Sequence, residues 1–234
     1  MMHRQRGNIL FLILLAIILF VALSYAIMGQ RDGSKNAAGE NLSLQVAQMT
    51  QYANLMENTV QRMMLVNDCK DTQIGFDNTV WLLSTGAVSH PANHNPNTPS
   101  DSCRVFSLQG GGMSPQTFAA LASGPVCSTC AKPGNPIILA VSVQDVGTSN
   151  PDLVLFVTYF SDALCQELNN ALGNGAILPS WTFTPYNVWA GSYGGATGIL
   201  GTGTAAALKG KRTGCGRWGG ATNDTQFYHV LIAR

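Results

Sequence analysis

Two cysteines in the stretch CSTC, Cys127 and Cys130, are the residues whose spacing most directly suggests chemistry. A Cys-x-x-Cys pair supports thiol–disulfide exchange when its first thiolate lies at the N-terminus of a helix, which lowers the thiol pKa. Here the stretch KPGNP follows at 132–136, and its two prolines prevent a helix from starting there. The pattern therefore favours a local structural disulfide over redox catalysis.

Histidines are the next candidates for chemistry. His90 and His94 have a spacing that would suit two metal ligands on one helix face, but Pro91 lies between them and Pro96 follows. We therefore expect solvated loop histidines, and we expect His229 to be packed or hydrogen-bonded in the last strand. Hydrolase and metalloprotease motifs do not occur in the sequence. The sequence predicts no catalytic residue, no metal site and no cofactor. We therefore expect a protein that is not an enzyme.

All six cysteines lie beyond the apolar N-terminal part of the chain. An even number with this distribution is typical of a disulfide framework formed in an oxidising compartment. Counting alone leaves many pairings open. We favour the pairings Cys69–Cys103, Cys127–Cys130 and Cys165–Cys215, of which the last closes a long C-terminal loop.

The segment 189–220 is rich in glycine and has aromatic residues at both ends. Exposed rings and cations supply contact area for a carbohydrate or another surface, and five residues are candidates for such contact: Trp189, Tyr193, Lys211, Arg212 and Trp218. In the alternative that we favour, the rings cover one end of a sheet and the glycines let the loop pass close over it. The chain has 13 basic and 12 acidic side chains, so no specific nucleic-acid partner is predicted.

The elements that must position these residues begin with an apolar run. Residues 9–28 contain no charged side chain, and a helix of about 20 residues spans roughly 30 Å, the thickness of the hydrocarbon core of a bilayer. Basic residues precede the run and mixed charges follow it, which favours a cytoplasmic N-terminus and an extracytoplasmic body. A cleaved signal peptide is less favoured, because the apolar core is longer than usual.

Composition and periodicity predict how the chain is divided into parts. We expect five parts: a basic leader over 1–7, a transmembrane or stem helix over 8–28, a glycine-rich hinge over 29–41, an amphipathic helix over 42–68, and a β-rich extracytoplasmic domain over 69–234. Within that domain, strands are predicted over 72–78, 79–85, 103–109, 135–147, 152–161 and 226–234. A short helix is predicted over 161–173. The expected fold class is α+β, with the amphipathic helix packed on an antiparallel sheet.

In its layout the chain resembles type IV pilins and pseudopilins. The shared features are a short basic leader that ends at Gly7, an apolar helix directly after it, an interrupted amphipathic helix, a sheet and a cysteine-closed C-terminal region. The stretches 161–173 and 214–233 are similar to the C-terminal disulfide region of the type IVb branch, in which a cysteine on a short helix pairs with one near the last strand. The resemblance implies cleavage after Gly7 by a prepilin peptidase, with Asn8 as the new, methylated terminus. Leu12 departs from the family, which has a glutamate there, and this favours a minor or initiating subunit.

The function implied by this resemblance is that of a structural subunit of a type IV pilus-like or type II secretion-like filament. Its partners would be other pilin-like subunits, the inner membrane before assembly, and the prepilin peptidase. Its location would be the inner membrane with an extracytoplasmic domain, and then a filament at the cell surface. The alternative is a single-pass anchored extracytoplasmic binding module that never polymerises.

Overall fold

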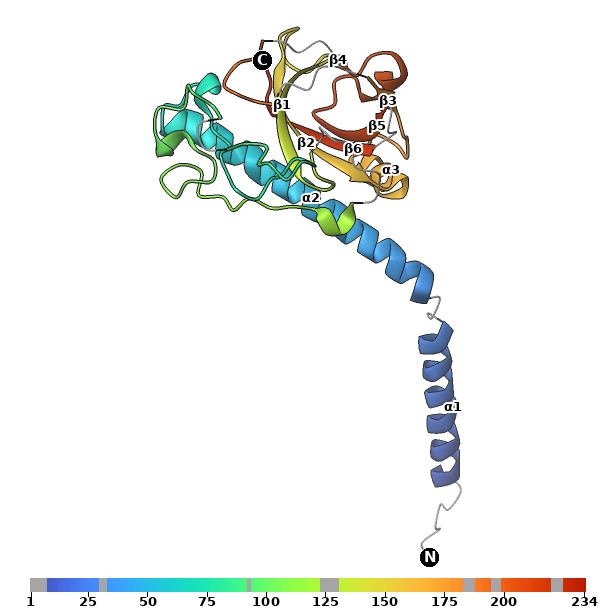
Figure 1. The fold of residues 1–234 in the computed structure, drawn as a ribbon. Helices are drawn as coiled ribbons and strands as arrows, with labels where there is room; N and C mark the ends of the chain where they lie inside the picture. Colours follow the sequence, from blue (N-terminus) through green and yellow to red (C-terminus); the bar gives the residue numbers. More distant parts are fainter. Residues whose placement is uncertain are drawn as a thin grey trace, which may run out of the picture. The chain divides into compact units, whose positions relative to one another are not determined.

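The computed structural model describes residues 8–29, 33–91, 94–122, 131–182, 188–194, 199–219 and 225–234. The chain divides into two compact units with a boundary between Leu42 and Ser43. The first unit contains α1 (Asn8–Gly29) and the beginning of α2 (Gly33–Val66). The second unit contains the rest of α2, one further helix and all the described strands (Figure 1).

The transmembrane helix predicted over 8–28 is not supported. A membrane span requires a helix of sufficient length and hydropathy. No helix in the described part of the chain satisfies the requirement for length and hydropathy. This finding overturns the predicted fold class, which depended on such a helix.

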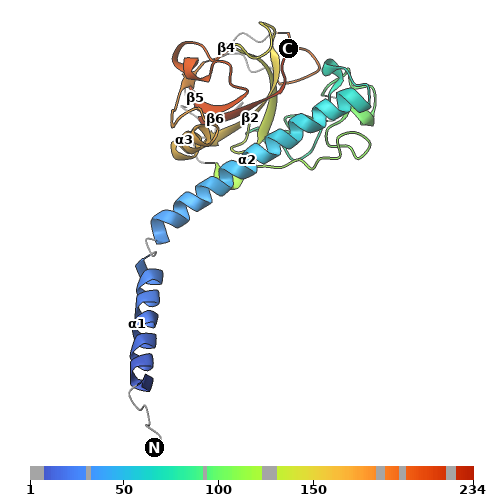
Figure 2. The ribbon, with the colours of Figure 1, turned by 180° about the vertical axis from the view of Figure 1, so that it is seen from behind.

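α2 begins at Gly33, so helical backbone extends into the segment 29–41 that the sequence predicts to be a hinge. In the second unit its buried side chains recur at steps of three and four residues, which places them on one face: Val46, Met49, Tyr52, Ala53, Met56, Val60 and Met63. Two opposite views show this part of α2 lying along the sheet (Figures 1 and 2). The helix is therefore held by packing as well as by its own hydrogen bonds.

Six strands form one sheet in the order β3-β5-β6-β2-β1-β4. The strands are β1 (Pro136–Val143), β2 (Asp152–Phe160), β3 (Ser180–Trp181), β4 (Ile199–Leu200), β5 (Thr213–Trp218) and β6 (Thr225–Ile232). The predicted hairpin of β1 and β2 is confirmed, and β6 pairs antiparallel with both β2 and β5. However, β4 pairs parallel with β1 and β3 pairs parallel with β5, so the sheet is mixed. The expectation of a purely antiparallel sheet is therefore wrong. The two-residue edge strands β3 and β4 follow long connections, and a long connection does not impose the antiparallel direction that a hairpin imposes.

Both faces of the central strands are covered, since every residue of β2 and of β6 is buried. Side chains alternate between the two faces of a strand. On β6, Tyr228 and Val230 point into an apolar cluster with Trp181 and Leu208, whereas His229 points toward α2. The predicted short helix is α3 (Asp162–Ala171), which begins where the Ser161 hydroxyl accepts a hydrogen bond from the Leu164 N–H at 3.2 Å.

The segment 67–122 is organised differently from the sheet. The strands predicted over 72–78, 79–85 and 103–109 are wrong: the described residues of this segment contain only isolated bridges, turns and the short 3-10 helices η1 (Asp71–Gln73), η2 (Asp101–Cys103) and η3 (Ala119–Leu121). Scattered backbone hydrogen bonds, such as that from the Gly75 N–H to the Cys103 carbonyl at 2.9 Å, are supplemented here by hydrogen bonds from side chains. Asn95, for example, donates from Nδ2 to the carbonyl oxygens of Thr72 and Ile74, at 3.1 and 2.8 Å.

Candidate functional site

The first candidate site is the surface of α1. Apart from the half-buried Ser24, the described side chains of this helix are apolar and exposed, and the large ones are Phe11, Ile13, Leu14, Leu15, Ile17, Ile18, Leu19, Phe20, Val21 and Leu23, with exposed fractions from 43% for Leu15 to 71% for Phe20. A helix that is apolar all round is stable in water only when another surface covers it. The exposed apolar side chains of α1 are therefore a candidate contact surface. Asn8 is its first residue, while Gly7 lies outside the described residues.

The second candidate is a polar junction that ties α2 to the sheet. Glu57 of α2 accepts a hydrogen bond from Arg212 Nη2 on Oε1 at 2.6 Å, and its Oε2 lies 2.9 Å from His229 Nε2. On the other side of the ring, His229 Nδ1 lies 2.6 Å from the Thr213 hydroxyl. One carboxylate thus connects the helix, the start of β5 and the centre of β6.

Burial governs the chemistry of this junction. The His229 side chain is 4% exposed, and burial lowers its pKa, although the Glu57 carboxylate acts in the opposite direction and the Arg212 cation reinforces the lowering.

A hydroxyl, an imidazole and a carboxylate in a row are also the parts of a nucleophilic triad. The groove beside the row, of about 240 Å³, is lined by Gln61, Met64, Leu65, Arg212 and 231–233, and neither Thr213 nor His229 belongs to its lining. A substrate in that groove would not meet the hydroxyl, and the hydrogen bonds of the row tie α2 to β6 and β5.

The basic residues near the C-terminus, which include the candidate contact residues Lys211 and Arg212, do not form a free cationic patch. Lys209 Nζ lies 3.1 Å from Asp145, Arg212 pairs with Glu57, and Arg217 pairs with Asp162. Lys211 is half-buried, and its carbonyl accepts a hydrogen bond from the Tyr228 hydroxyl at 2.9 Å. Most of this positive charge is therefore neutralised within the chain.

The aromatic candidates lie mostly inside the molecule. Trp189 is 1% exposed and donates from Nε1 to the Ile74 carbonyl at 2.9 Å, and Tyr193 is 8% exposed beneath the Arg234 guanidinium, 3.9 Å from its ring centroid. Trp218 is half-buried at the end of β5. Trp189 and Tyr193 are thus placed as in the favoured alternative, with their rings packed inside the molecule and not exposed for contact.

His90 is buried, which corrects the expectation of a solvated loop residue. It is 1% exposed, and its Nε2 accepts a hydrogen bond from the Ile138 N–H of β1 at 3.1 Å. Burial lowers the pKa of His90 to about 3 and, together with the neighbouring His94, keeps the ring neutral.

Asp77 pairs with Arg104 at 3.3 Å, and burial raises the pKa of the Asp77 carboxyl. Within the described residues, no group of three or more His, Cys, Asp or Glu side chains could hold a metal ion.

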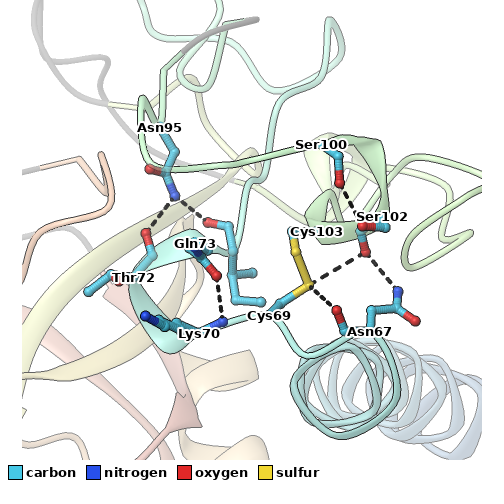
Figure 3. The surroundings of a disulfide bond; sticks show 10 residues. Asn67, Cys69, Lys70, Thr72, Gln73, Asn95, Ser100, Ser102 and Cys103 are labelled. Atoms are coloured by element: carbon cyan, nitrogen blue, oxygen red, sulfur yellow. Dashed lines mark hydrogen bonds between the residues drawn. A yellow bond between two sulfur atoms is a disulfide. The ribbon is translucent and has the colours of Figure 1, made fainter.

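Two of the favoured disulfides are present. Cys69–Cys103 joins the end of α2 to η2, where Asn67 also donates to the Ser102 carbonyl at 2.7 Å (Figure 3). Cys165–Cys215 joins α3 to β5, as favoured from the sequence. Cys127 and Cys130 lie outside the described residues.

Comparison of the chain with models of known protein families, with characterised proteins and with solved structures found no match.

Sequence reasoning missed the junction and the burial of His90. Glu57 falls among the polar residues of the amphipathic pattern, and nothing in its spacing distinguishes it from the exposed Gln51 or Gln61. The signal that was available is His229, a polar residue inside an otherwise apolar final strand. A buried imidazole requires hydrogen-bond partners, which predicts a partner on the element that covers the strand.

Proposed function

We propose that this protein is a structural subunit of a type IV pilus-like filament, in which α1 packs against the α1 helices of other subunits. The observation that carries the proposal is the exposed apolar surface of α1. Packing of several such helices side by side would remove these side chains from water, at roughly 25 cal/mol for each Å² of apolar surface buried. The remaining domain would then form the outer part of the filament.

Other features support a structural rather than an enzymatic role. Neither Thr213 nor His229 lines the groove beside the junction, and the cations Lys209, Arg212 and Arg217 each pair with a carboxylate of the chain. Two disulfides and a sheet buried on both faces suit a subunit that works outside the cytoplasm. Processing after Gly7 by a prepilin peptidase is part of the proposal, with Asn8 as the first residue of the assembled subunit.

Photo-crosslinking tests the helix contact. A photoreactive amino acid replaces Phe20, which is 71% exposed on α1, and a matched variant carries it at Ile199, which is 54% exposed on β4. We expect irradiation of cells to yield a ladder of crosslinked multimers from the Phe20 variant and much less from the Ile199 variant. The proposal fails if the Phe20 variant yields only monomer.

A further inference from the structure

A second groove lies between α2 and the segment that follows the three glycines at 110–112. Its volume is about 530 Å³, within the usual range for small-ligand sites, and it is lined by Tyr52, Leu55, Asn58, Thr59, Arg62, 111–114 and Gln116. The glycines shape it. A side chain at Gly111 would meet the Val105 carbonyl and lie 2.7 Å from Thr59 Cγ2, so only glycine lets this loop close on α2.

Arg62 is the distinctive residue of this groove. Of the arginines in the described part of the chain, Arg104, Arg212, Arg217 and Arg234 each lie within 4 Å of a carboxylate, whereas Arg62 has no such partner there. Its Nη2 donates to the Gly111 carbonyl at 2.8 Å, which fixes the guanidinium at the groove wall. No acidic residue lines the groove. A fixed guanidinium with free N–H groups is suited to a carboxylate.

The other polar groups of the groove suit a polyhydroxyl ligand. Asn58, Ser114 and Gln116 are exposed on its two walls, and Leu55 and Met113 supply apolar surface between them. Amides and hydroxyls both donate and accept hydrogen bonds, as the hydroxyl groups of a sugar require. The side chains of Asn58, Ser114 and Gln116 are uncharged, so the specificity for a carboxylate depends on Arg62.

An extended peptide fits this groove less well. A peptide that adds to an open backbone edge needs free main-chain N–H groups. Along the wall these groups are already used: the N–H of Gly112 donates to the Ser107 carbonyl at 2.8 Å, that of Met113 to the Val105 carbonyl at 3.2 Å, and that of Gln116 to the Tyr52 hydroxyl at 3.2 Å. We propose that the groove binds an acidic saccharide, with its carboxylate on Arg62 and its hydroxyl groups on Asn58, Ser114 and Gln116.

Calorimetric titration of the full chain with trigalacturonic acid tests this site, and neutral maltotriose and a triglutamate peptide serve as comparison ligands. We expect saturable binding of trigalacturonic acid alone. Arg62→Gln should weaken it roughly tenfold or more, because a charge-assisted hydrogen bond is lost. Asn58→Asp should weaken it through repulsion, while Arg217→Gln, which changes an arginine outside the groove, should leave it unchanged.

Several results would overturn the assignment. These are the absence of saturable binding, equal binding of maltotriose, preferential binding of triglutamate, or an affinity that neither Arg62→Gln nor Asn58→Asp changes. Thermal melts of the variants separate a loss of binding from a loss of folding. The result does not depend on whether the chain forms filaments.

Discussion

The sheet and the segment 67–122 belong to the same compact unit but are stabilised in different ways. In the sheet, the backbone groups of β2 are satisfied by the neighbouring strands β1 and β6, and the side chains contribute apolar packing. In the segment 67–122, scattered backbone hydrogen bonds replace the regular ladders, and the buried Asn95 side chain and one disulfide supplement them. The sheet therefore distributes its stability over many residues, whereas the segment 67–122 concentrates it in a few.

The two disulfides offer the largest test of this difference. They close loops of similar length, with sequence separations of 34 and 50, so loop entropy alone predicts a loss of about 4 kcal/mol for removing either. The location of the damage should differ. In Cys69→Ser/Cys103→Ser, hydrogen exchange should accelerate mainly in 67–122, while in Cys165→Ser/Cys215→Ser it should accelerate throughout the sheet. Identical exchange patterns in the two double variants would remove the distinction.

Acid should weaken the attachment of the segment to the sheet through His90. Its folded pKa of about 3 lies below the ordinary histidine value of 6.5, so the unfolded chain binds a proton that the folded chain does not, and stability falls as the pH drops from 6.5 toward 3. The loss should reach about 3 kcal/mol at pH 4 relative to pH 7. His90→Gln keeps an acceptor for the Ile138 N–H and should remove most of this slope in urea titrations. A slope that persists in the variant would assign the acid sensitivity to other groups.

The junction at Glu57 should have an intermediate effect. Glu57→Gln leaves Arg212 and the buried His229 without their carboxylate and should lower the free energy of unfolding by about 2 kcal/mol. Glu40→Gln changes an exposed glutamate on the same helix and serves as the control. Equal stabilities of the two variants in urea would show that the junction contributes nothing measurable.

Exposed ion pairs should have the smallest effect. Lys209 and Asp145 are each about half exposed, so water and salt screen their interaction. Lys209→Gln should change the unfolding free energy by less than about 0.5 kcal/mol. A larger loss in the same urea titration would mean that the loop before β5 depends on this pair.

The contrast between the two regions also explains what the sequence could predict. The apolar runs of β1, β2 and β6 and the capped α3 follow from periodicity and turn chemistry, and their pairing follows from the short connection between β1 and β2. The segment 67–122 has strand-like composition around Trp81 and Val105, yet its structure depends on contacts with residues far along the chain, such as Asn95 with Gly191 and Trp189 with Ile74. Local patterns carry no information about such contacts.

The candidate sites divide in the same way. The two described disulfides agree with the favoured pairings. An even set of cysteines in an extracytoplasmic pattern is a strong signal for disulfides, although it does not determine how they pair. The aromatic surface around Trp189 was a candidate from composition alone, and composition does not determine which side of a loop faces the core. The groove at Arg62 depends on a single close approach of Gly111 to α2, which only the folded chain reveals.

The most direct test of the proposed filament function is the mass of the N-terminal peptide of the protein isolated from its own cells. A subunit processed for assembly should begin at Asn8, with a methylated terminal amine. A protein that begins at Met1 or Met2 would contradict the account, because the leader would still precede α1.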